Sequence, residues 1–545
     1  ARPRAPATFP MAPCRTPFRP HASRPRRAGG RSAALLVALV AASACRGSFP
    51  SQPADSPTVR VGNPVPISSF EPRRAFLSEN TRFANLVYEG LTMVDAEGRT
   101  VPALADRWTV SPDGRVYRFH LRPGAVFHDG TPVTAADVER SWLAALRTSA
   151  AEAPYMLDPI EGADEVAAGR AERLRGLTVV GDSLVELRIE RPLALLPTLL
   201  SLPQAAIVAR ANGPARPVGT GPWRWVRGQP RTGEEIWLAR HEGYWGPRPQ
   251  LDSVVIRTVP DSLQLEAFER RWIDFTNLVA AEARTQLSSE SRVGFMEAPS
   301  TGIFRLTINT ADPRFRDPRV RRAFSHAIDV AKLARTFPAS SGAIAAGALP
   351  PGFAGADPAR KAYAYDPALA RRLLEEAHFP FRWPVRFWAP AANQGEFPPE
   401  LAPLIRDYLE AVGLKVELHQ DSTAWDMMAA NRADLVLESW YADYADADAF
   451  LYPLFHSRTA GAAGNSGRYA DRETDRWIDS SRASQDSARR AEFLRRADRR
   501  VFDQAANVFL WFTKMPTAYS LRLDGWTPTS YTARYQELRL ADDRP

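Results

Sequence analysis

The hydrophobic positions of this chain follow two periods that alternate along the sequence. Tyr117, Phe119 and Leu121 alternate with basic residues, which predicts a half-buried strand. Farther on, Asp317-Pro318 supplies a helix N-cap and a proline at the first helical position. The apolar residues that follow have the spacing of one helical face, and they are Val320, Ala323, Phe324, Ala327, Ile328 and Ala331.

The same alternation continues through the C-terminal half. Asp366-Pro367 opens a second helix, and a third is expected from about Pro399 to Gly413, where glycine favours a left-handed helix end. Residues 414–418 then alternate as a strand, and residues 435–437 predict a buried strand. Strands that alternate with helices indicate an α/β fold.

His128 and Asp129, close behind the first strand, raise the question of a catalytic or metal-binding cluster. We interpret His128-Asp129-Gly130 as a turn, because Asp tolerates turn geometry and Gly supplies a positive φ. Thr134 and Asp137 then have the spacing of a helix cap. The sequence places no further metal ligand near His128, so we favour a structural role for this stretch.

Composition and charge change this picture little. The 545 residues are 45% hydrophobic and 24% charged, as in globular proteins with room for two or three domains. The net charge of +8 belongs to the first 45 residues, which contain eight arginines and no acidic residue. Of the 70 Lys and Arg residues, 62 remain beyond this segment, against 62 Asp and Glu. The body therefore lacks the basic excess that phosphate binding requires, and we expect no nucleic-acid partner.

The N-terminal segment predicts export. An apolar run, AALLVALVAA at 33–42, follows the Arg-rich leader and is too short to span a bilayer. Ala42-Ser43-Ala44-Cys45 resembles a lipobox, so we expect a signal peptide at 1–44, lipidation of Cys45 and a linker at 45–57. Ordinary cleavage after an Ala-x-Ala site is the alternative. Cys14 and Cys45 are the only cysteines, so the body has no disulfide and no Cys-based site.

Enzyme motifs are absent from the sequence. It contains no G-x-S-x-G, no H-E-x-x-H and no G-x-x-x-x-G-K-[ST]. VGTGPW (Val218–Trp223) lacks the third glycine of a dinucleotide-binding loop, and we interpret it as a turn. The eight histidines are scattered. We therefore predict no catalytic residue, no metal site and no cofactor.

One acidic cluster follows the buried strand at 435–437. In SWYADYADADAF (Ser439–Phe450), three aspartates lie among aromatic residues: Asp443, Asp446 and Asp448 among Trp440, Tyr441 and Tyr444. Open α/β sheets place ligands at the carboxyl ends of their strands. A calcium site is one interpretation, although the spacing lacks the glycine and terminal Glu of an EF-hand. A solvated turn is another, and a carboxylate that receives a cationic ligand group between aromatic walls is the third.

Eight segments in order resemble the bacterial extracellular solute-binding proteins of family 5, the oligopeptide- and dipeptide-binding components of ABC importers. They are LRPGAVFHDGTPVTAADV, VGTGPW, HEGYWGPRPQLDSVVIRTVPD, DPRVRRAFSHAID, DPALARRLLEEAHF, GLKVEL, WYADYADADAF and NSGRY. The resemblance covers nearly all of 57–530. Two positions depart from the family: Ala447 replaces a proline, and His378 replaces a common glycine.

The resemblance implies a two-lobe, periplasmic-binding-protein-like (type II) α/β fold with an extra third domain and a ligand enclosed between the lobes. We expect lobe I to be discontinuous, with crossovers near 300 and 500. The expected boundaries are 58–100, 201–300 and 501–545 for lobe I, 101–200 for domain II and 301–500 for lobe III.

The resemblance also implies a function. Asp443 takes the position of the family's W-x-x-D-Y aspartate, which holds a peptide's α-amine, and Trp440, Tyr441 and Tyr444 complete the expected ligand site. The implied protein is a monomeric lipoprotein at the periplasm or cell surface, anchored through Cys45, that delivers short peptides to permease subunits. A non-peptide solute such as nickel, haem, an opine or a sugar stays open, as do an extracytoplasmic hydrolase and a transcriptional regulator.

Overall fold

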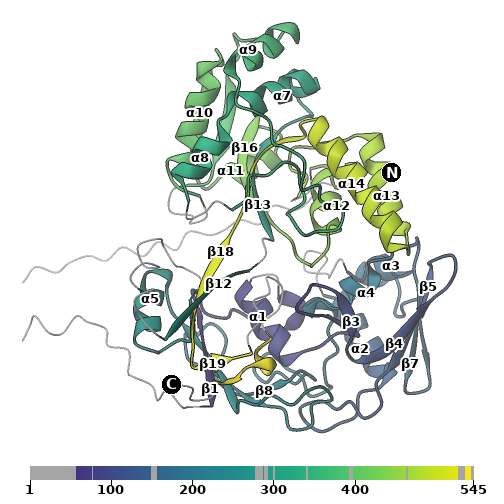
Figure 1. Cartoon of the computed structure of the whole chain (residues 1–545). Helices are drawn as coiled ribbons and strands as arrows, with labels where there is room; N and C mark the ends of the chain where they lie inside the picture. The colour runs from purple at the N-terminus through teal and green to yellow at the C-terminus, as the bar shows by residue number, and fades with distance from the viewer. Residues whose placement is uncertain are drawn as a thin grey trace, which may run out of the picture. The chain divides into compact units, whose positions relative to one another are not determined.

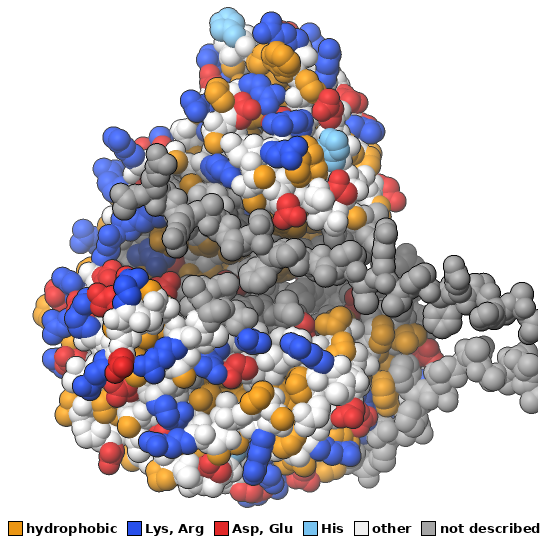
Figure 2. Space-filling model, turned by 180° about the vertical axis from the view of Figure 1, so that it is seen from behind, with side chains coloured by type: hydrophobic (Ala, Val, Ile, Leu, Met, Phe, Trp, Pro, Cys, Tyr) orange, Lys and Arg blue, Asp and Glu red, His pale blue; other side chains and the backbone are white. Residues whose placement is uncertain are grey.

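A computed structural model describes residues 57–75, 78–148, 156–276, 287, 292–298, 301–338, 342–391, 397–461, 464–525 and 534–541. The expected signal peptide, Cys45 and nearly all of the linker lie outside these residues. Among the helices of the described part, none is both long and apolar enough to cross a membrane. Basic and acidic side chains are mixed over the face shown in Figure 2, as the formal neutrality of the body leads one to expect.

The largest sheet has seven strands gathered from distant parts of the chain. In spatial order they are β12 (Val293–Ala298), β18 (Met515–Ser520), β11 (Phe275–Thr276), β1 (Thr58–Asn63), β10 (Ser253–Thr258), β9 (Ile236–Arg240) and β8 (Trp223–Arg227). β1 is parallel to β10 and β11, and the other pairs are antiparallel. The helices α1 (Ser78–Val87) and α5 (Asp261–Glu269) accompany this sheet.

A four-stranded antiparallel sheet forms within the segment expected as domain II. Its order is β4 (Ala105–Val110), β5 (Val116–Leu121), β7 (Leu184–Arg188) and β6 (Leu177–Val180). The helices α2 (Ala135–Leu146), α3 (Ala163–Ala167) and α4 (Leu196–Leu199) pack into the same hydrophobic core. There are also two short antiparallel pairs: β2 (Thr92–Val94) with β3 (Thr100–Pro102) in the N-terminal part, and β19 (Leu523–Asp524) with β20 (Arg539–Leu540) near the C-terminus.

The five-stranded sheet carries the predicted ligand loop. Its order is β15 (Val416–Gln420), β14 (Val385–Ala389), β16 (Leu435–Tyr441), β13 (Gly302–Ile308) and β17 (Asn507–Phe512). One face is covered by α7 (Pro318–Ala327), α8 (Val330–Thr336), α9 (Pro367–Glu376) and α10 (Leu401–Ala411). The other is covered by α12 (Asp448–Phe455), α13 (Arg472–Ala483) and α14 (Ser487–Asp503), as Figure 1 shows. α11 (Ala424–Ala429) packs beside β14 and β16.

The chain passes between the two larger sheets twice. It leaves the seven-stranded sheet between β12 and β13 and returns between β17 and β18, the yellow strand of Figure 1. Strand pairing within the five-stranded sheet therefore continues through Phe512, past the expected crossover near residue 500. The division into three domains stays a prediction.

Most predicted helix starts are confirmed by their caps. The carboxylate of Asp317 accepts a hydrogen bond from the Arg319 amide at 2.8 Å, and that of Asp366 accepts one from the Leu369 amide at 2.8 Å. The first predicted helix is shorter than its apolar stripe, however. It ends at Ala327, because the next residue is extended and Asp329 caps a new helix, α8, through the Lys332 amide.

The turn at His128 is confirmed and has a structural role. Nδ1 of His128 accepts a hydrogen bond from the Gly219 amide at 3.3 Å, and Nε2 lies 3.0 Å from the Gly221 carbonyl. The ring is therefore neutral with its proton on Nε2, and burial lowers the pKa of His128 to about 3. These bonds join the turn to VGTGPW.

The two departures from the family affect the backbone differently. Ala447 has φ −58°, close to the angle that a proline ring imposes, so the replacement keeps the local conformation. His378 has φ +51°, in the left-handed region where a Cβ atom is unfavourable. A glycine would adopt this angle without strain.

A buried ion pair fixes the strand that leads to the ligand loop. Arg305 on β13 donates from Nη2 to Oε2 of Glu438 on β16 at 2.9 Å, and the two side chains are 1% and 0% exposed. Thr307 and Ser466 donate their hydroxyl hydrogens to the same carboxylate, each at 2.7 Å. Arg305 also donates to the Gly464 carbonyl at 2.9 Å. Three chain segments thus meet at one carboxylate: β13, β16 and the turn that contains Gly464 and Ser466.

We expect Glu438→Gln to destabilise the protein strongly. The substitution leaves the Arg305 guanidinium buried without its counter-charge, which costs about 3–5 kcal/mol in other buried pairs. Urea unfolding followed by tryptophan fluorescence measures the effect. The matched control is Glu375→Gln, which breaks an exposed pair with Arg371 and costs about 0.5 kcal/mol or less. Equal shifts of the two unfolding midpoints would contradict the assigned weight of the buried pair.

Candidate functional site

The three aromatic residues predicted for the ligand site lie at the end of β16 and in the loop behind it, and each has different surroundings. The indole Nε1 of Trp440 donates to the Ala449 carbonyl at 2.8 Å, which ties the strand end to α12. Tyr444 is buried, and its hydroxyl donates to Asp448 at 2.9 Å. Tyr441 is 40% exposed and lies over Gly302, where a Cβ atom would meet its ring.

The three aspartates of the loop divide into two groups. Asp446 forms an ion pair with Arg490, with N–O distances of 2.6 and 2.8 Å. Asp448 is fully buried and pairs with Arg482 at 2.7 Å. Asp443 is exposed and contributes to the walls of two cavities. The calcium interpretation loses its ligand set, because two of the three carboxylates are already bound to arginines.

The described residues contain no group of three or more His, Cys, Asp and Glu side chains placed to hold a metal ion. In the loop behind β16, the reason is that Asp446 and Asp448 form ion pairs with Arg490 and Arg482. Of the three aspartates, Asp443 is the exposed one, and it lines both cavities.

The larger cavity has a volume of about 890 Å³, within the range of small-molecule sites in proteins. Asp443, Trp440 and Tyr444 line it on the side of the five-stranded sheet, together with residues of α12 and α13. The opposite wall comes from the four-stranded sheet region. That wall consists of Asp158, Pro159, Leu199 and residues 190–193. Tyr441 lines neither cavity among the described residues.

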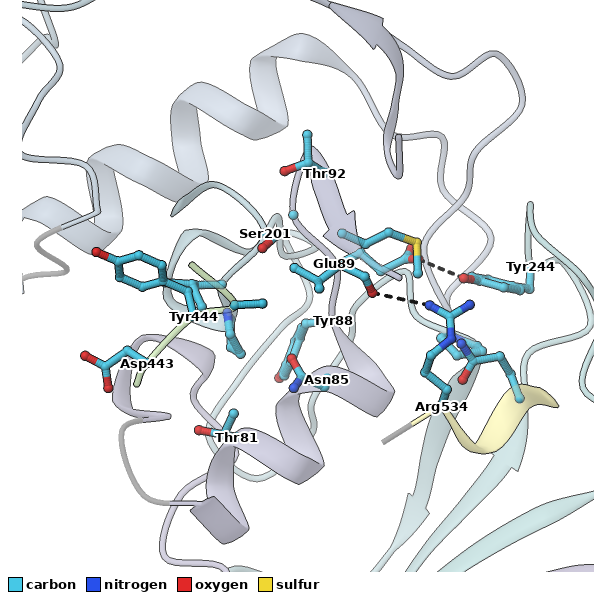
Figure 3. A pocket seen from close by; sticks show the side chains of 18 residues that line it. Thr81, Asn85, Tyr88, Glu89, Thr92, Ser201, Tyr244, Asp443, Tyr444 and Arg534 are labelled. Atoms are coloured by element: carbon cyan, nitrogen blue, oxygen red, sulfur yellow. Dashed lines mark hydrogen bonds between the residues drawn. The ribbon is translucent and has the colours of Figure 1, made fainter. Parts of the chain in front are cut away.

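The smaller cavity, of about 80 Å³, lies on another side of Asp443. Figure 3 shows Asp443 and Tyr444 on one side of it and Glu89, Tyr244 and Arg534 on the other. Asp443 thus stands where the two cavities approach each other, and a group bound to its carboxylate can extend into either.

Glu89, just behind α1, is a half-buried acid that the sequence did not single out. Its carboxylate accepts hydrogen bonds from Tyr244 and Thr220 at 2.9 Å and from Trp245 at 3.0 Å. The guanidinium of Arg122 stacks 4.0 Å from the Trp245 ring centroid. Burial raises the pKa of Glu89 to about 7, although these hydrogen bonds and the charge of Arg122 act in the opposite direction.

VGTGPW has a packing role next to this acid. Gly219 and Gly221 lie against the Val87 and Leu86 carbonyls at the end of α1, too close for any Cβ atom. The glycines thereby place Thr220 within hydrogen-bonding distance of Glu89. The prediction that this motif is a turn and not a phosphate loop agrees with these contacts.

The two walls of the larger cavity are also bonded to each other. The Ala194 amide donates to the Arg482 carbonyl at 2.6 Å, and Gln485 donates from Nε2 to the Tyr117 hydroxyl at 2.9 Å. Tyr444 packs into the hydrophobic core of the four-stranded sheet region. Residues around the turn between α13 and α14 therefore close one end of the cavity.

Comparison with known proteins identifies the relatives of this chain. A family model described as bacterial extracellular solute-binding proteins, family 5 Middle, matches residues 99–462. Di/tripeptide-binding protein 2 of Pseudomonas aeruginosa is 27% identical, over 92% of this chain and 98% of that protein. Heme-binding protein A of Haemophilus influenzae is 28% identical, over 79% and 80% of the two chains.

The fold has solved counterparts. The periplasmic binding protein DppA from Helicobacter pylori, in complex with the peptide STSA, superposes with a TM-score of 0.72. It shares 22% identity, and the match covers 89% of this chain and 98% of that one. This likeness confirms the expected fold class of a two-lobe periplasmic binding protein.

We expect Glu89 to give the protein a pH-dependent stability. Between its ordinary pKa of 4.5 and about 7, the folded chain keeps a proton on Glu89 that the unfolded chain has released. This contribution to stability is therefore fully present below about pH 4.5 and is lost as the pH rises through about 7. Glu89→Gln should flatten the profile by about 1–3 kcal/mol between these limits.

Urea midpoints at several pH values in this range measure the effect. Glu97→Gln is the control, because Glu97 is an exposed acid at a turn and its loss should leave the wild-type slope. Parallel profiles for wild type and Glu89→Gln would contradict the assignment.

Proposed function

The chain belongs to the bacterial extracellular solute-binding proteins of family 5, and from this premise we propose that it captures short peptides outside the cytoplasm for an ABC importer. The observation that carries the proposal is the position of Asp443. Its carboxylate lines both cavities at the end of β16, and Trp440 and Tyr444 flank it in the larger one.

Asp443 offers what a peptide amine requires. A buried ammonium group is costly unless a carboxylate receives it, and charge-assisted hydrogen bonds of this kind are stronger than neutral ones. The aromatic neighbours add an apolar surface and a favourable environment for a cation. The neighbouring aspartates are bound to Arg482 and Arg490, and these ion pairs hold the loop in place.

The names of the relatives favour a peptide over other solutes. Several of them bind di- or tripeptides, dipeptides or glutathione by name. One relative is a haem-binding protein by name, so haem is the second solute class to compare. A haem ligand usually needs an axial side chain, and His456, which is buried and lies 3.3 Å from Asp479, does not offer one. We therefore favour the peptide.

Reversible capture without turnover completes the proposal. We propose that the protein acts as a monomer, that Cys45 carries a lipid anchor, and that permease subunits receive the ligand. The apolar run at 33–42 and the small residues before Cys45 support export and anchoring. No triad of nucleophile, base and orienting acid is assembled among the described residues of the larger cavity, which favours binding over hydrolysis.

Asp443→Asn is expected to weaken the binding of short peptides by about tenfold or more, because the amide keeps the shape but loses the charge. Isothermal titration with di- to tetraalanine measures the dissociation constant. Asp426→Asn, an exposed surface acid on α11, serves as the control and should bind like the wild type. Unchanged affinity in Asp443→Asn would remove this residue from the site.

The cargo itself is a second test. Native purification followed by denaturation and mass spectrometry should release a set of short peptides. A ligand present at a hundred times its dissociation constant adds about 2.7 kcal/mol to stability, so peptides that bind should also raise the melting temperature. Release of a single non-peptide species, with no thermal response to peptides, would replace the proposed substrate.

A further inference from the structure

Glu89 is an acid without a counter-charge of its own. It is half-buried and forms part of the wall of the smaller cavity. Among the residues that the structure describes, no Lys, Arg or His nitrogen lies within 4.0 Å of its carboxylate. Arg122 acts on it from a distance, through the Trp245 ring on which it stacks. Because a charge withdrawn from water is costly unless it is paired, a cation in this cavity would supply what the protein lacks.

The hydrogen bonds of Glu89 leave room for one more donor. A carboxylate has about four acceptor positions, two on each oxygen. Thr220 and Trp245 both donate to Oε2, whereas Tyr244 alone donates to Oε1. Oε1 therefore keeps one acceptor position, beside the hydroxyl of a residue that lines the cavity.

The hydroxyl groups of this cavity favour the same kind of ligand. In the described wall, every residue with a hydroxyl already donates its hydrogen to an acceptor within the protein, and these residues are Thr81, Tyr88, Thr92, Ser201, Tyr244 and Tyr444. A hydroxyl whose hydrogen is engaged can only accept a hydrogen bond from a ligand. An ammonium group, which has three donors and no acceptor, is complementary to such a wall.

The remaining charges of the wall do not oppose a cation. Arg534 lines the cavity, but its Nε donates to Glu537 at 2.7 Å and its Nη1 to the Val94 carbonyl at 3.3 Å. Asp443 is the other charged residue of the described wall, across the cavity from Glu89 (Figure 3). With Arg534 balanced by Glu537, the two acids of the wall remain, and they attract a positive group.

We infer that the smaller cavity is a cation subsite, in which Glu89 receives the side-chain ammonium of the residue whose α-amine Asp443 receives. This inference rests on the proposed function and specifies its substrate class: short peptides that begin with a basic, lysine-like residue. The cavity volume of about 80 Å³ suits this group, because it holds roughly two or three groups of the size of a water molecule at about 30 Å³ each.

The ammonium competes with a proton for the open position of Oε1. Burial raises the pKa of Glu89 to about 7, so at about pH 6 the empty protein keeps a proton on this acid. The charged groups that face Glu89 are Arg122 behind Trp245, and Arg534 and Asp443 in the cavity wall. A basic ligand must displace the proton, so its affinity should rise as the pH increases from about 6 to about 8.

Peptides that differ in their first side chain test the subsite on the full-length protein. Isothermal titration compares Lys-Ala-Ala and ornithine-Ala-Ala with norleucine-Ala-Ala, which keeps the methylene chain of lysine but lacks the ammonium. We expect the basic peptide whose length fits the cavity to bind about tenfold or more tightly than the norleucine peptide at about pH 7.5.

Proton release supplies a second readout that needs no variant. At about pH 6, the binding enthalpy of the basic peptide should differ between phosphate and Bis-Tris buffers, because these buffers take up a released proton with different heats. The difference should correspond to roughly one proton per bound peptide. The norleucine peptide should release close to none.

Glu89→Gln should bring the affinities for the basic and norleucine peptides together and abolish the proton release. Circular dichroism checks that the variant is folded, and if it is not, the two measurements on the wild type decide alone. Glu97→Gln, which changes an exposed acid outside the described cavity wall, is the matched control and should keep both effects.

The outcomes separate this inference from the proposed function. Equal affinity for basic and norleucine peptides, without proton release, overturns the cation subsite and leaves peptide capture intact. A preference for the basic peptide that persists in folded Glu89→Gln overturns the role of Glu89. Absence of binding by every peptide, together with no peptide among the released cargo, overturns peptide capture itself.

Discussion

The ion pair of Arg305 and Glu438 is the constraint on which the ligand site depends. A charge buried this completely is tolerated because every partner of the carboxylate is supplied by the protein: a guanidinium and two hydroxyl groups. These partners come from β13 and from the turn at 464–469, so the pair fixes β16 between them. Glu438 and Trp440 point to the same face of the strand, and the ligand loop begins immediately behind.

The loop behind β16 contains further acidic side chains that are stabilised by arginines. Asp448 and Asp446 face arginines on α13 and α14, and Tyr444 adds a hydrogen bond to Asp448. Acids that look equivalent in sequence therefore differ in their surroundings, because helices far along the chain supply arginines to two of them. Position relative to these helices, and not the spacing of the aspartates, determines which acids form these ion pairs.

The local sequence was enough to predict helix caps and turns. It was not enough to predict contacts between residues that lie far apart in the chain. The caps at Asp317 and Asp366 and the turn at His128 were predictable because their partners lie within a few residues. The role of Asp443 was expected from motif resemblance and stays a prediction. Glu89 was not predictable, because its hydrogen-bonding partners lie more than a hundred residues away and none has a distinctive spacing. The chain returns after β17, a few residues past the crossover expected near residue 500, because strand pairing continues through Phe512.

Arg482 joins the two walls of the larger cavity with different parts of one residue. Its carbonyl accepts a hydrogen bond from the Ala194 amide, while its side chain lines the larger cavity, the candidate ligand site. Ligand binding in the cavity and the contact between its two walls would share this residue, so the two equilibria would be thermodynamically linked. Such linkage is reciprocal: if a bound ligand stabilises the contact between the walls, that contact raises the affinity for the ligand by the same free energy. A membrane partner that senses how firmly residues 190–195 are held would then distinguish loaded from empty protein without touching the cargo.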